Sequence, residues 1–172
     1  MPFGWTWRCR VALCLLTISL NTWACTPAPR SSQAPPAQAR ADSAALAGAA
    51  TRFLADFDSL NWAGFTGALS DSVEIFWPRA DTPGRLRGRT AVEGRFRPFF
   101  TQIRAARPGP PFLHLQVQAL SVRTLGAVGL VSFELTDVPD TLGRRTLVFQ
   151  QEHGAWRLIH LHASNLPLPV QR

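Results

Sequence analysis

The chain has 172 residues, of which 46% are hydrophobic and 10% aromatic, enough apolar material for one globular domain with a sizeable core. Its net charge of +7 comes from 18 arginines without a single lysine. The arginines are scattered, with short groups only at residues 85–89 and 95–97, so we expect no nucleic-acid partner. Tyrosine is absent, which removes a common acid and hydrogen-bond donor from every pocket.

The N-terminus is typical of a secretory signal peptide. Arg8 and Arg10 precede an apolar stretch at residues 11–20, and a small residue, Ala24, follows shortly before Cys25. An apolar stretch of about ten residues is too short to span a membrane, which takes about 20. We therefore expect residues 1–24 to be removed and the mature protein to be exported to the cell envelope without a transmembrane helix.

Residues 20–25 resemble a bacterial lipobox. Ala24 stands before Cys25 as the motif requires, whereas Trp23 and Thr22 depart from it. Two outcomes stay open: acylation of Cys25, which would anchor the protein to the membrane, or ordinary cleavage. The other two cysteines lie inside the signal, so the mature chain would hold one thiol and no internal disulfide.

The remaining sequence predicts a tethered α+β domain. Residues 25–41 are rich in proline and alanine and predict a disordered tether, 42–168 the domain, and 169–172 a tail. Helices are predicted at 42–57, 60–69 and 90–104, the last with Thr90 and Glu93 as a capping box. Strands are predicted at 73–77, 112–123, 128–137, 146–152 and 156–164, with a loop at 79–87.

This order of elements resembles the nuclear transport factor 2-like superfamily of SnoaL-like domains. Asn61-Trp62, Phe76-Trp77-Pro78, the run RGRTA at 87–91 and the run GAWRLIHLHAS at 154–164 carry the resemblance, which covers residues 46–167. It implies a cone-shaped α-α-β-α-β-β-β-β domain, with a strongly curved antiparallel sheet packed on three helices. Within the superfamily, the chain is most similar to the association domain of calcium/calmodulin-dependent kinase II.

The resemblance also implies which residues face the cavity. It places Ile159, Leu161 and Ala163 on the cavity side of the last strand, and His160 and His162 on the opposite side, where such domains pack sheet against sheet as homodimers. Nine residues are predicted to line a ligand pocket: Trp62, Phe65, Phe76, Phe96, Phe100, His114, Ile159, Leu161 and Ala163. For the aromatic members of this set, a role in the core remains the alternative.

The resemblance does not carry over a ligand preference. Ala163 and Leu147 stand where the kinase association domain has arginines, and Phe65 stands where it has a tyrosine. Most polar pocket groups of that domain are therefore absent at the matching positions.

Catalysis in such a cavity would require a carboxylate base and an acid that stabilises an enolate. The candidates are Asp58, His114, Glu134, His160 and His162, and each has a surface, capping or interface role as its alternative. His160 and His162 could both touch one metal ion, but no third ligand is spaced for it, so no metal site and no cofactor are predicted. Serine elbows, phosphate loops and nucleotide-binding fingerprints are absent from the sequence.

Three functions follow from these features. The first is an exported or lipid-anchored domain that binds a small, mostly apolar ligand in its cone and forms a homodimer through its sheet. The second is an isomerase, cyclase or dehydratase that acts in the same cavity. The third is a structural module for dimerisation or assembly.

Overall fold

The computed structural model describes residues 36–79, 81, 84–136 and 140–169. Contacts divide the chain into two units, Met1–Gln33 and Ala34–Arg172, and the described residues lie in the second. The predicted signal peptide, Cys25 and most of the predicted tether lie outside the described residues. In the part that is described, no helix is long and apolar enough to cross a membrane.

The described residues form three helices, as the periodicity predicts. Helix α1 spans Pro36–Asp58, so it begins six residues before the predicted boundary at Asp42. Helix α2 spans Trp62–Gly67, and the Asn61 side chain caps it by accepting a hydrogen bond from the Gly64 backbone N–H at 3.4 Å. Helix α3 spans Arg89–Ala106 and continues through Pro98.

The start of α3 differs from the predicted capping box at Thr90 and Glu93. The N-cap is Gly88, and no side chain caps this end. Gly88 has a φ of 80°, a conformation that glycine adopts without steric strain, and its N–H donates to the Val73 carbonyl at 2.8 Å. The helix begins at Arg89, one residue before the predicted range of 90–104. This backbone bond, rather than a side-chain cap, anchors the start of the helix at the sheet.

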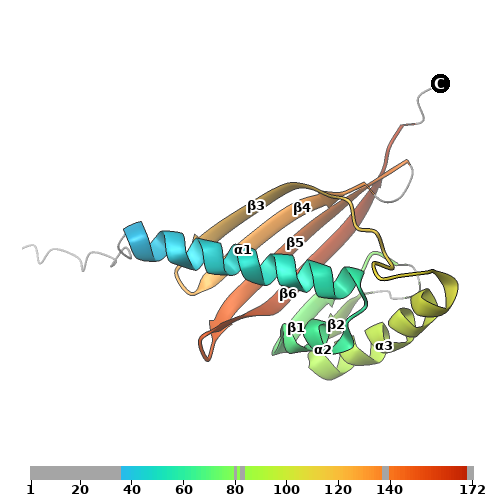
Figure 1. The fold of residues 1–172 in the computed structure, drawn as a ribbon, viewed down its shortest axis with the longest axis horizontal. Coiled ribbons are helices and arrows are strands. Elements are labelled where there is room, and N and C mark those ends of the chain that lie inside the picture. The colour runs from blue at the N-terminus through green and yellow to red at the C-terminus, as the bar shows by residue number, and fades with distance from the viewer. Residues whose placement is uncertain (1–35, 80, 82–83, 137–139, 170–172) are drawn as a thin grey trace, which may run out of the picture. The chain divides into compact units, whose positions relative to one another are not determined.

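Six strands form one sheet (Figure 1). They are β1 (Leu69–Phe76), β2 (Arg85–Arg87), β3 (Val117–Leu125), β4 (Val128–Leu135), β5 (Thr141–Glu152) and β6 (Ala155–Pro167), in the order β2-β1-β6-β5-β4-β3. The α+β class is confirmed. Two details were predicted wrongly: residues 85–87 form a strand instead of a loop, and β1 pairs with β6 in parallel, so the sheet is mixed.

All three helices lie on one side of this sheet, which we call its inner face. Helix α1 contacts β3, β4 and β6, while α3 contacts β1 and β2 (Figure 1). Strand β4 shows the alternation clearly: Gly129, Val131, Phe133 and Leu135 are buried on the inner face, and the residues between them are half-buried on the outer face. The core forms where this inner face meets the apolar stripes of α1 and α3.

A β-bulge in β6 changes the predicted alternation of the last strand. Val148 on β5 pairs with His160 and Phe149 pairs with Leu158, so Ile159 is the extra residue. Leu158 and Leu161 are therefore both buried, whereas Ile159 is only half-buried. The alternation predicted for residues 159–163 therefore holds only from His160 onward, because one inserted residue reverses the phase of a strand.

Candidate functional site

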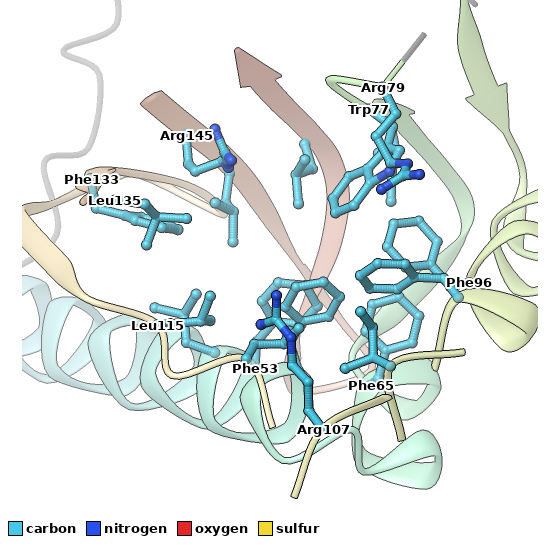
Figure 2. Close-up of a pocket in the computed structure, with 18 residues that line it drawn as sticks. Phe53, Phe65, Trp77, Arg79, Phe96, Arg107, Leu115, Phe133, Leu135 and Arg145 are labelled. Carbon is cyan, nitrogen blue, oxygen red and sulfur yellow. The ribbon is translucent and has the colours of Figure 1, made fainter. Parts of the chain in front are cut away.

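A cavity of ≈ 230 Å³ lies between the helices and the inner face of the sheet (Figure 2). Every helix contributes to it, as do β1, β4, β5, β6 and the connector between α3 and β3. The lining residues are Phe53, Leu54, Phe57, Phe65, Ile75, Trp77, Arg79, Phe96, Phe99, Ile103, Arg107, Leu113, Leu115, Phe133, Leu135, Arg145, Leu147 and Leu161.

Aromatic rings form the helical wall of the cavity. Phe53 and Phe57 lie one turn apart on α1, so they project from the same side of the helix. The Phe57 ring centroid lies 5.8 Å from that of Phe65 and 6.0 Å from that of Phe96. Trp77 closes the group, with its ring edge-on to Phe96 at 4.8 Å. These centroid distances are those of favourable aromatic pairs, so the wall is rigid and apolar.

Strand alternation provides the opposite wall. Val73 and Ile75 are buried on β1, and the same parity continues to Trp77 and Arg79 just beyond the end of the strand. On β5, Arg145 precedes Leu147 by two residues, so both side chains project from the inner face.

The connector after α3 brings two leucines, Leu113 and Leu115, to the cavity, and Asp58 holds it in place. The Asp58 carbonyl accepts the N–H groups of Phe112 at 2.9 Å and Leu113 at 3.3 Å. The Asp58 Oδ1 accepts the Leu115 N–H at 3.3 Å. Asp58 is not itself among the lining residues, so its observed contacts are those of a positioning residue.

Among the described lining residues, the ionisable ones are three arginines. Arg145 donates to the Ser164 carbonyl at 2.8 Å and, through both terminal nitrogens, to Asn165 Oδ1 at 3.2 Å. Arg79 forms an exposed ion pair with Asp81 at 3.2 Å. Arg107 is the C-cap of α3 and is exposed. The described lining contains no aspartate, glutamate or histidine.

The residues predicted for the pocket fall into different places. Phe65, Phe96 and Leu161 line the cavity. Trp62 and Phe100 line a separate, smaller pocket of ≈ 130 Å³ between α2 and α3. Ala163 is buried on the inner face of β6 but is not a lining residue, and Ile159 occupies the bulge.

Phe76 and His114 lie away from the cavity. Phe76 is 36% exposed on the outer face, because the parity of β1 turns Ile75 and Trp77 inward instead. His114 is exposed and has a φ of 54°, and this left-handed backbone turns it away while its neighbours Leu113 and Leu115 line the cavity.

The other catalytic candidates lie on the outer face of the sheet. The His160 and His162 rings flank Phe76, at centroid distances of 5.9 and 5.7 Å. Glu134 on β4 is opposite Arg144 on β5. Within the described ranges, no group of three or more histidine, cysteine, aspartate or glutamate residues could hold a metal ion. The fold therefore does not gather the five candidates into one site.

Several lining residues were missed from the sequence. Phe53 and Phe57 were not named as pocket residues, although their four-residue spacing places them on one face of the predicted helix. The two-residue alternation with Ile75 would have identified Trp77, and the alternation with Leu147 would have identified Arg145. Arg107 has no such signal, because its position depends on where α3 ends relative to the sheet.

Comparisons with known proteins agree with this architecture. No curated protein matches the sequence. An NTF2-like protein of unknown function from Pseudomonas putida superposes with a TM-score of 0.62 at 17% identity, over 77% of this chain and 91% of that one. A proposed dehydratase of the NTF2-like family from Streptomyces avermitilis gives 0.61 at 17% identity, over 76% and 99%.

The association domain of calcium/calmodulin-dependent kinase II from C. elegans is also similar, with a TM-score of 0.57 at 15% identity, over 74% of this chain and 98% of that one. At these identities, the three structures show a shared fold. The family model for the SnoaL-like domain matches residues 47–169, which is most of the chain. The chain therefore belongs to the SnoaL-like domain family.

Proposed function

We propose that this protein binds a small, mostly apolar molecule in its cavity and performs no acid–base chemistry on it. The observation that carries the proposal is the lining: of the 18 described side chains in it, 15 are aliphatic or aromatic and three are arginines. Concave, mostly apolar sites with a few placed polar groups are the usual form of small-molecule sites.

The lining supports a binder over an isomerase, cyclase or dehydratase. Those reactions require a carboxylate or imidazole within reach of the reacting proton. Arginine remains protonated at all ordinary pH values and is a poor base. Of the catalytic candidates, Asp58 positions a connector, and His114, Glu134, His160 and His162 lie outside the cavity.

The cavity volume indicates a ligand of modest size. A dry apolar cavity of about 150 Å³ holds benzene, and sites for drug-sized ligands start at about 300 Å³. At ≈ 230 Å³, this cavity fits one ring with a short chain.

Filling the cavity is expected to abolish this binding. We expect the full-length protein to bind indole or 3-phenylpropanamide saturably in isothermal titration calorimetry, and Leu115→Trp to weaken that binding at least about tenfold, because the larger side chain occupies ligand volume. Leu125→Trp is the matched control, since Leu125 is 60% exposed and is not a lining residue. The proposal fails if neither probe binds and native mass spectrometry of the purified protein shows no retained molecule.

The location of this function is proposed from the sequence alone. The positively charged and apolar segments before Cys25 support export, and Ala24-Cys25 supports a lipid anchor in the cell envelope. The mass of the mature N-terminus distinguishes an acylated Cys25 from ordinary signal cleavage.

An assembly role is the second candidate, and the outer face of the sheet favours it. Phe76 is 36% exposed and Leu166 is 42% exposed on the face that carries His160 and His162. The similarity to a kinase association domain also supports self-association. We expect a homodimer in sedimentation velocity that Phe76→Glu dissociates and that Leu125→Glu, at the exposed end of β3, leaves intact. A wild-type monomer at every concentration would contradict this role.

A further inference from the structure

We infer that the cavity ligand is an amphipathic anion, specifically a small aryl or medium-chain carboxylate whose apolar body fills the cavity and whose carboxylate meets the arginines. This inference rests on the proposed binding function and defines its ligand class. Its starting point is the sign of the charges: in the described part of the chain, every ionisable lining residue is an arginine.

The three arginines come to the lining from three separate segments and lie at different places around it. Arg79 follows β1, Arg107 ends α3, and Arg145 lies on β5 (Figure 2). Among the described lining residues there is no aspartate or glutamate. Cationic groups around a low-dielectric apolar wall attract an anion more strongly than they would in open water.

Arg145 is held in a fixed orientation. Arg145 is half-buried, and its guanidinium donates to the Ser164 carbonyl at 2.8 Å, to the Asn165 side-chain oxygen at 3.2 Å and to the Arg144 carbonyl at 3.0 Å. The Ser164 and Asn165 acceptors belong to β6, so the neighbouring strand helps to determine where the guanidinium points. A pre-oriented group loses less conformational entropy on binding, and the planar fork of arginine matches the geometry of a carboxylate.

Arg107 provides a second, more adjustable cation. Its backbone N–H donates to the Ile103 carbonyl at 3.0 Å, which fixes the end of α3, whereas its side chain makes no hydrogen bond or ion pair with another described residue. Arg79 is 47% exposed and already pairs with Asp81, so we expect it to contribute less.

The rest of the cavity determines the body of the anion. Phe53, Phe57 and Phe96 give it an aromatic wall, and the volume of ≈ 230 Å³ limits it to one ring with a short chain or to a medium-length alkyl chain. The kinase association domain has arginines at the positions of Leu147 and Ala163. The cavity arginines of this chain are at other positions, so the inference rests on this chain's own residues and not on that resemblance.

The test compares ligands of nearly equal shape and different charge. Titration calorimetry of the full-length protein measures the affinity for 3-phenylpropanoate, its neutral amide and 3-phenylpropylamine. We expect the carboxylate to bind at least about tenfold more tightly than the amide, and this advantage to shrink at high salt. Arg107→Gln and Arg145→Gln should each reduce the carboxylate's advantage severalfold and leave amide binding within about twofold.

Arg123→Gln is the matched control, since it removes the same charge from an exposed position on β3 that does not line the cavity, and it should leave all three affinities unchanged. Arg107 is exposed at a helix end, so its variant tests the inference even if Arg145→Gln disturbs β6. Equal binding of carboxylate and amide, or equal losses in the Arg123 variant, would overturn the anion inference while the binding function stands. Failure of all three ligands and of indole to bind, with no molecule retained in native mass spectrometry, would overturn both.

Discussion

Phe65→Ala is expected to lower the free energy of unfolding by about 3–5 kcal/mol, a large share of the roughly 5–15 kcal/mol that stabilises a typical domain. The Phe65 side chain is 1% exposed and joins α2 to both other helices. Its ring centroid lies within 6.0 Å of those of Phe53, Phe57, Trp62, Phe96 and Phe100. Truncation removes these contacts and leaves a void that rigid neighbouring rings cannot fill.

Urea unfolding measures this loss, and Phe76→Ala is the matched control. Phe76 is also a phenylalanine at the edge of the apolar region, but it is 36% exposed and its ring contacts are with His160 and His162. We expect its truncation to cost roughly 1 kcal/mol or less, because less apolar area returns to water. Equal losses for the two variants would mean that the aromatic cluster is not the centre of the core.

Gly129→Ala is expected to destabilise the domain by about 1–3 kcal/mol, although it adds only one methyl group. Gly129 is buried on the inner face of β4, directly under α1. A Cβ there would lie 2.4 Å from Leu46 Cδ2 and 2.6 Å from Leu46 Cδ1, and Leu46 is fully buried. Since the leucine has no free space into which to move, α1 would have to shift away from the sheet.

Thermal unfolding compares this variant with Gly94→Ala. Gly94 lies within α3, and a Cβ there meets nothing within 4 Å. Alanine favours a helix interior by roughly 0.5–1 kcal/mol over glycine, so Gly94→Ala should raise the melting temperature while Gly129→Ala lowers it. At roughly 2–4 °C per kcal/mol for a chain of this size, the opposite shifts are easily resolved. A stabilised Gly129 variant would show that α1 packs more loosely on β4 than described.

The sequence predicted the cavity walls better than the polar groups of the site. Leu161 was placed on the cavity side by the family resemblance, and Phe65 and Phe96 were named as aromatic residues of the pocket with a core role as the alternative. Phe76 lies on the other face of its strand and Ile159 lies in a β-bulge, because choosing a strand face requires knowing its parity and its bulges. Ionisable residues were selected for their chemistry instead of their position, and this choice favoured His160 and His162 over Arg107 and Arg145.

The sequence alone thus determined the features that depend on residues close together in the chain. These are the three predicted helices, the β-rich C-terminal half, the α+β class and the family resemblance. Hydrophobic periodicity is a property of consecutive residues and can be read without the fold. The parallel pairing of β1 with β6, the strand at residues 85–87 and the presence of Arg79, Arg107 and Arg145 in one cavity lining depend on contacts between distant segments. Only the tertiary structure decided these, because the free energy that selects them comes from packing between elements and leaves no periodic signal in any one of them.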